Sequence, residues 1–161
     1  MHRFRYFIGD LSNGLEKEHE KILSSNEEIL TVYRGAKLHK EEFEQLKQNV
    51  NKLISTNGYL STSRDRLRAL SFAKKSTKRP DVIPVLFQIH CDIKQIGHSV
   101  IFADIEKFCV FPQEQEVLFD VDAVFRIDSI QADGERKIIK MTVTNEAQAI
   151  GRHFKIGRAH V

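Results

Sequence analysis

The alternating stretches on either side of Asp133-Gly134 constrain the fold of this chain most. Residues 124–130 and 138–143 alternate apolar and polar side chains, which is the period of a strand with one buried face. Asp-Gly between two such stretches favours a tight hairpin, because the turn needs residues that tolerate a positive φ. The nearly continuous apolar stretch 82–90 predicts a buried strand, with Pro84 at a bulge, a start or an edge.

Three helices are expected in the first half of the chain. The first covers 14–24, and Ser12 or Asn13 is expected to cap its N-terminus. The second covers 39–54, with an apolar face opposite a charged one. The third opens at a capping-box pattern over 62–65 and runs to about residue 75. Its inward-facing residues are expected to be Leu67, Leu70 and Phe72.

The remaining strands are expected to be short. Residues 30–33 are β-branched and aromatic and predict a strand that ends at Arg34-Gly35. Residues 101–103 and 117–119 predict two more, and 145–153 could begin a further helix. Early helices followed by strands without regular βαβ alternation indicate an α+β domain with a largely antiparallel, two-sheet core.

Composition places the chain among ordinary soluble globular proteins. Its 161 residues fit one domain, and 41% hydrophobic and 29% charged residues are usual values. The formal net charge of +3 is too small and too dispersed to indicate a nucleic-acid partner, and it mildly favours an anionic ligand. Cys91 and Cys109 are the only cysteines, which suits free thiols in a reducing compartment; a single disulfide is the alternative.

The N-terminal residues do not form a secretory signal. Residues 1–9 contain Arg3 and Arg5 and no long apolar core, and no later stretch is long enough to span a membrane. An intracellular, cytoplasmic chain with no membrane partner is therefore expected. Residues 156–161 resemble the in-frame translation of a common sequencing adapter, so a single domain is expected over 1–155.

Two carboxylates lie just before the strand expected at 117–119. In an extended segment Glu114 and Glu116 point to the same side, with Cα atoms about 6 to 7 Å apart. Like charges so close repel each other, so such a pair is a poor structural element. It is better suited to acting on a cationic group. The plainer interpretation is a solvated strand end.

Two further polar sites precede these carboxylates, at Arg34 and at Ser61-Thr62-Ser63. Their order and context resemble the arginine-specific mono-ADP-ribosyltransferases, whose motif runs Arg, then Ser-Thr-Ser, then Glu-x-Glu. The resemblance extends over roughly 30 to 130, which makes it far more specific than one short motif. The matching stretches, in family order, are 32–35, 58–63, 69–73, 85–89, 102–105, 114–119 and 125–127.

The resemblance implies an ADP-ribosyltransferase-like fold and NAD+ as co-substrate, with no metal. It assigns Arg34 to the phosphate and nicotinamide-ribose region, which suits a guanidinium fork. Gly35 would offer backbone groups to the nicotinamide amide. Thr62 and Ser63 would support the strand or the NAD+ pocket, although helix capping alone could explain both. Phe72 is a candidate neighbour of the nicotinamide or adenine, and a core position is its plainer interpretation.

The catalytic residues implied by the resemblance are Glu116, Ser61 and Glu114. Breaking the nicotinamide glycosidic bond builds positive charge on the ribose, which a fixed carboxylate stabilises. Glu116 matches the family's catalytic glutamate, bonded to the ribose 2′-hydroxyl, and Ser61 would orient it. Glu114 would pair with the guanidinium of an arginine-bearing acceptor protein and take up its proton.

The implied activity is NAD+-dependent protein-arginine mono-ADP-ribosylation with release of nicotinamide. An NAD+ glycohydrolase and a non-catalytic NAD-binding or interaction module are the alternatives. The histidines and cysteines at 90, 91, 98 and 109 match no standard zinc spacing. A basic region beside the expected pocket is interpreted as a solvated helix face that could assist NAD+ phosphates or an acidic partner. It consists of Arg64, Arg66, Arg68, Lys74, Lys75, Lys78 and Arg79.

Overall fold

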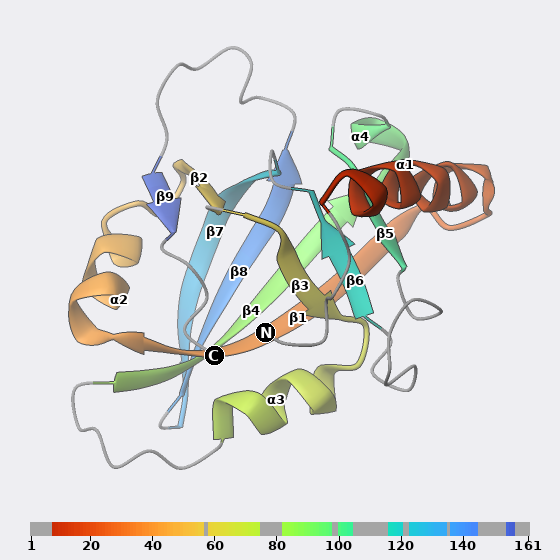
Figure 1. The fold of residues 1–161 in the computed structure, drawn as a ribbon. Helices are drawn as coiled ribbons and strands as arrows, with labels where there is room; N and C mark the ends of the chain where they lie inside the picture. Colours follow the sequence, from red (N-terminus) through yellow and green to blue (C-terminus); the bar gives the residue numbers. More distant parts are fainter. Residues whose placement is uncertain are drawn as a thin grey trace.

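A computed structural model describes residues 8–56, 58–74, 82–97, 100–104, 116–120, 123–134, 136–144 and 154–156 (Figure 1). The helices are α1 (Ile8–Ser24), α2 (Lys40–Lys47), α3 (Arg66–Lys74) and α4 (Ile93–Ile96). The strands are β1 (Ile29–His39), β2 (Leu53–Thr56), β3 (Leu60–Ser63), β4 (Val82–Asp92), β5 (Phe102–Asp104), β6 (Glu116–Phe119), β7 (Val124–Asp133), β8 (Arg136–Thr144) and β9 (Phe154–Ile156).

The described strands form one nine-stranded sheet in the order β5-β6-β3-β1-β4-β8-β7-β2-β9. Its pairs are antiparallel except β4 with β8 and β2 with β9. The centre is the β1–β4 ladder, which is paired from Ile29↔Asp92 to His39↔Val82. The β7–β8 hairpin turns at Gly134, whose φ of 66° is a conformation that glycine adopts without strain. The α+β class, the largely antiparallel sheet and this hairpin are therefore confirmed.

The sheet folds back on itself between β3 and β1. Those two strands share one register pair, Tyr33↔Ser63, among the described residues. Phe119 of β6 nevertheless packs against Phe125 of β7, with ring centroids 5.5 Å apart, although β3, β1, β4 and β8 lie between β6 and β7 in the ladder. The expected two-sheet core is thus a single hydrogen-bonded ladder bent into two packed layers. In Figure 1, β3 and β6 cross in front of β1 and β4.

Helices cover the outer faces of both layers. Ala69 and Leu70 of α3 pack on Leu86 of β4, and in Figure 1 α3 lies along the lower side of the sheet. Leu15 of α1 packs on Ala103 and Leu118 of the β5–β6 layer. None of the helices in the described part of the chain is long and apolar enough to cross a membrane.

A buried histidine ties α1 to β5 and α4. The ring nitrogens of His19 lie 2.9 Å from the carbonyl oxygen of Phe102 and 2.8 Å from that of Gly97. The ring also packs edge-on against Phe102, with centroids 4.8 Å apart. Because both polar atoms of the ring contact backbone carbonyls, the helix is held at one position along the β5–β6 layer.

Two expected helices differ in extent from the observed ones. Helix α1 begins at Ile8, so Ser12 and Asn13 lie inside it and do not cap it. Helix α2 ends at Lys47, earlier than expected, and Asn51 turns the chain with a φ of 70°. The apolar residues that continued the helical spacing belong instead to β2, where Ile54 pairs with Phe125. Tertiary pairing outweighed local periodicity there.

The expected strand end at Arg34-Gly35 was wrong. Strand β1 continues to His39, and Gly35 pairs with Leu86 inside the ladder. The long partner strand β4 explains this, because every residue of β1 adds to an existing ladder. Arg34 therefore sits in mid-strand, beside the point where β3 leaves β1.

The start of α3 also differs from the capping-box expectation. Asp65 is the cap: its Oδ1 accepts from the backbone N–H groups of Leu67 at 3.0 Å and Arg68 at 3.4 Å. Ser63 Oγ accepts from the backbone N–H of Asp65 at 3.0 Å, just before the helix. Leu70 is buried as expected, whereas Leu67 is 73% exposed, so its inward placement was wrong.

Several expectations fall outside the described residues. They concern Glu114 and Cys109, the helix expected over 145–153, and most of the tail. The side chain of Phe72 is likewise outside them. Ile156, the first residue assigned to the tail, is the last residue of β9, where it pairs with Thr56.

Prediction for the bend. Phe119→Ala should lower the free energy of unfolding by about 3 to 5 kcal/mol, because a fully buried ring joins the two layers. Phe119→Leu should cost much less, since it keeps most of the apolar volume. Urea unfolding followed by circular dichroism measures both. Leu67→Ala on the exposed face of α3 is the control and should stay within about 0.5 kcal/mol of wild type. If Phe119→Ala lowered the free energy of unfolding as little as Leu67→Ala does, the two-layer packing would be contradicted.

Candidate active site

A serine and a glutamate meet across the β3–β6 ladder. Ser63 pairs with Glu116 and Ser61 with Leu118, so Ser61 and Glu116 are diagonal neighbours on one face. Ser61 Oγ donates to Glu116 Oε2 at 2.6 Å, the short distance expected for a hydroxyl on a carboxylate. Glu116 is only 2% exposed. The carboxylate is therefore held in place before any ligand arrives.

Arg34 reaches the same place from β1. Its Nη1 donates to the backbone carbonyl of Ser61 at 2.9 Å. Burial lowers the pKa of the Arg34 guanidinium from its ordinary value, and the negative charge of Glu116 opposes that change. An arginine stays protonated in proteins, so β1 carries a buried positive charge beside a buried negative one.

One donor of Arg34 lacks an acceptor within the described part of the chain. This donor is Nη2, which is buried and makes no hydrogen bond to any described residue. Leaving a buried charged donor unsatisfied is costly, so such a donor needs a partner such as water, an ion or a ligand. A phosphate or other anion suits this donor, because guanidinium groups bind such oxygens through paired N–H groups.

The other expected cofactor residues surround this pair. Thr62 points away from Ser61, and its Oγ1 donates to the carbonyl of Val117 at 2.7 Å, which ties β3 to β6. Ser63 is the register partner of both Tyr33 and Glu116. Gly35 follows Arg34 inside β1. The structure thus brings together Arg34, Ser61 and Glu116 directly, with Gly35, Thr62 and Ser63 in adjoining backbone.

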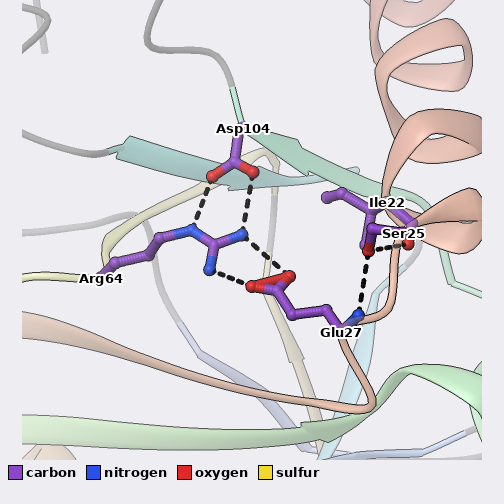
Figure 2. A network of polar contacts seen from close by, with 5 residues as sticks. All are labelled: Ile22, Ser25, Glu27, Arg64 and Asp104. Atoms are coloured by element: carbon purple, nitrogen blue, oxygen red, sulfur yellow. Dashed lines mark hydrogen bonds and ion pairs between the residues drawn. The ribbon is translucent and has the colours of Figure 1, made fainter.

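Arg64 was wrongly grouped with solvated surface cations. Its guanidinium lies between the carboxylates of Asp104 and Glu27 (Figure 2). Burial works against its charge, but hydrogen bonds and attraction from both carboxylates outweigh burial, so the pKa of Arg64 is raised. No sequence signal pairs these residues, since Glu27, Arg64 and Asp104 are distant in the chain. Arg66, by contrast, is exposed as expected.

Other candidates contribute little to this site. Cys91 is a free, buried thiol on β4, and burial first, then the charge of Asp92, raises its pKa to about 12. Such a thiol is inert. Across the residues that the structure describes, no three His, Cys, Asp or Glu side chains group closely enough to hold a metal ion.

The chemistry available follows from the paired charges. Arg34 offers a cationic donor for an anion, unsatisfied among the described residues, and Glu116 offers a fixed negative charge on β6, which β3 separates from β1 in the sheet. In a site of low dielectric, such preorganised charges stabilise a transition state more than they do in water. The pair suits a substrate that is anionic at one end and gains positive charge at its reacting centre.

Solved structures share this fold. The Vis toxin, an ADP-ribosyltransferase from Vibrio Splendidus, aligns with a TM-score of 0.60 and 20% identity over 92% of this chain. Vis in complex with agmatine aligns with a TM-score of 0.59 and 16% identity over 97% of this chain and 83% of that one. An exoenzyme of Clostridium limosum aligns with a TM-score of 0.54 and 18% identity, over 86% of this chain and 71% of that one.

These likenesses confirm the expected ADP-ribosyltransferase-like fold. The chain spans 63% of the length of the Vis toxin chain that it matches at 20% identity. Comparison with curated proteins found no match. The family model described as ADP-ribosyltransferase exoenzyme matches residues 7–147, which is most of the sequence. The chain therefore belongs to the ADP-ribosyltransferase exoenzyme family.

Proposed function

We propose that this chain is an NAD+-dependent mono-ADP-ribosyltransferase that transfers ADP-ribose to an arginine side chain of an acceptor protein. The observation that carries the proposal is the contact set of Ser61, Glu116 and Arg34. A serine holds a buried carboxylate, and a neighbouring guanidinium keeps one buried donor free of partners among the described residues. NAD+ has the matching properties: an anionic diphosphate and a ribose carbon that becomes cationic as nicotinamide leaves.

Arg34 binds the anionic side of NAD+ in this proposal. Its Nη2 would donate to a phosphate oxygen or to the nicotinamide ribose, while Nη1 keeps its bond to Ser61. Gly35 would lend backbone groups to the nicotinamide amide. Thr62 and Ser63 would act indirectly, by keeping β3 paired with β6 and β1.

Glu116 acts on the bond that breaks. When the bond between the ribose C1 and the nicotinamide nitrogen cleaves, its electron pair leaves with nicotinamide and C1 becomes positively charged. The Glu116 carboxylate would bond the 2′-hydroxyl and offset this charge. Ser61 keeps the carboxylate oriented, so little reorganisation is needed during the reaction.

Glu114 is proposed to select the acceptor. As a guanidinium nitrogen attacks C1, the new C–N bond leaves an extra proton on the acceptor, and Glu114 would accept it. Agmatine, present in a solved Vis complex, carries the same guanidinium group, which supports an arginine-like acceptor here. The alternative is water as acceptor, because Arg34, Ser61 and Glu116 would serve hydrolysis equally well.

Prediction for Glu116. Glu116→Gln keeps an oxygen to accept from Ser61 but removes the negative charge. The rate of nicotinamide release, to water and to polyarginine alike, should fall by roughly thirtyfold to a thousandfold, which corresponds to about 2 to 4 kcal/mol of transition-state stabilisation. NAD+ affinity should change little. Chromatographic assay of nicotinamide measures the rates, and calorimetric titration with a non-hydrolysable NAD+ analogue measures affinity.

The matched control for Glu116 is Glu28→Gln. Glu28 forms an exposed ion pair with Lys94, with both side chains about 70% exposed, so its loss should leave the rate unchanged. Near-wild-type nicotinamide release by Glu116→Gln would refute the catalytic assignment.

Prediction for Glu114. Glu114→Gln should separate two activities, because an amide still hydrogen-bonds a guanidinium but accepts no proton. Polyarginine labelling should fall by roughly a hundredfold, whereas nicotinamide release to water should persist. The measured quantity is the ratio of labelling to release, in the variant and in wild type, with folding checked by thermal melting.

The alternatives give other results in the same assay. A glycohydrolase would label no polyarginine even as wild type, and a non-catalytic module would release no nicotinamide. If both rates changed by the same factor in Glu114→Gln, the residue would not select the acceptor.

A further inference from the structure

Arg64 makes the most extensive ion-pair network among the described residues. Nε and Nη2 donate to the two oxygens of Asp104 at 2.7 and 2.8 Å. Nη1 and Nη2 donate to the two oxygens of Glu27 at 2.5 and 3.3 Å. Figure 2 shows the guanidinium plane spanning both carboxylates. We call these three residues the Arg64 cluster.

The Arg64 cluster joins three segments that each adjoin the candidate site. Arg64 follows Ser63, the register partner of Glu116 and of Tyr33. Asp104 is the last residue of β5 and pairs with Val117, the neighbour of Glu116. Glu27 lies just before β1, the strand of Arg34, and its N–H donates to Ser25 Oγ at 3.2 Å (Figure 2). The cluster therefore links β3 and β5 to the segment that leads into β1.

The bridge lies where strand pairing is weakest. Between β1 and β3 the described residues share the single register pair Tyr33↔Ser63. Arg34 adds one bond, from Nη1 to the carbonyl of Ser61. Longer ladders hold β3 to β6 and β1 to β4, but these two ladders belong to different layers. Strand pairing alone therefore holds Glu116 only weakly relative to Arg34, and a further interaction between the two layers is needed.

We propose that Arg64 is a positioning residue, whose paired forks to Asp104 and Glu27 hold the β3–β6 layer, and with it Glu116, at its working distance from Arg34. The role rests on the proposed function. Arg64 touches neither reacting group; it acts through the backbone of β3 and β5. A lysine could not replace it, because one ammonium cannot bond four carboxylate oxygens in a plane.

This position predicts a distinctive kinetic effect. NAD+ binding depends on Arg34, which stays on the intact β1–β4 ladder when Arg64 is changed. The transition state depends on where Glu116 stands, and a displacement of about 1 Å costs on the order of a hundredfold in rate. Loss of the cluster should therefore lower kcat and leave KM for NAD+ nearly unchanged.

Prediction for the Arg64 cluster. Nicotinamide release by Arg64→Lys, Arg64→Ala and Asp104→Asn is measured over a range of NAD+ concentrations. All three should lower kcat by about tenfold to a hundredfold, with KM within about twofold of wild type. The double variant Arg64→Lys with Asp104→Asn should lose no more than the worse single variant, because both changes break the same contact. If Arg64→Ala does not fold, the two conservative variants decide the test.

Two controls separate positioning from stability. Lys94→Ala breaks an exposed ion pair with Glu28 and should keep wild-type kcat. Ile54→Val trims the buried core on β2, which β4, β8 and β7 separate from β1 in the sheet, and lowers the melting temperature without touching the Arg64 cluster. Each variant is assayed below its own melting temperature, so a purely structural residue would lower stability and leave kcat per folded molecule intact.

The outcomes are distinguishable. A lowered melting temperature with wild-type kcat in the Arg64 variants would overturn the positioning role and leave the proposed function standing. A raised KM with unchanged kcat would also overturn it, because the cluster would then act on binding. Absence of nicotinamide release by wild type would overturn the proposed function itself, and the positioning role with it.

Discussion

The packing of Phe119 on Phe125 is the contact on which the rest of the molecule depends. It joins strands that are far apart in the ladder, and Phe102 also packs against Phe119, with ring centroids 5.3 Å apart. Aromatic side chains bury large areas and prefer tilted and edge-on contacts such as these. Because the stack closes the bend, one hydrogen-bonded sheet encloses a core on its own concave side.

The same bend explains how charged residues come to be buried. β3 and β1 part after a single register pair, and the negative charge of Glu116 acts on Arg34 across this divergence. Isolated, either charge would be expensive to bury. Here Ser61 accepts from Arg34 through its carbonyl and donates to Glu116 through its hydroxyl, and the two opposite charges attract each other. The hydrophobic stack therefore offsets the energetic cost of a polar site that the fold alone would not favour.

The fold could be predicted from the sequence where pattern and pairing agree. The Asp133-Gly134 hairpin and the buried strand β4 were correct because alternation, apolar content and turn chemistry pointed the same way. The end of β1 was wrong because Arg34-Gly35 looks like a break, whereas the partner β4 carries the ladder through it. The end of α2 was wrong because residues of β2 happened to continue a helical spacing.

The site was predicted in part for a related reason. The motif order indicated that Arg34, Ser61 and Glu116 belong together, and the structure places them in a common bonded group. The cap at Asp65 is a local contact, and it was missed because the capping-box pattern over 62–65 set the helix start at Thr62. The Arg64 cluster could not be predicted, because its partners lie in other segments. Local sequence carries no record of such distant partners.

The hydrogen bonds of the site span long stretches of chain: Arg34 to Ser61 crosses 27 residues and Ser61 to Glu116 crosses 55. Contacts so distant in sequence form late in folding, since the entropy of closing the intervening loops must be overcome first. A nascent chain that has emerged only as far as β5 holds Arg34 and Ser61 but has no carboxylate at position 116. The charge pair can therefore form only after the chain through β6 has been synthesised and β6 has paired with β3.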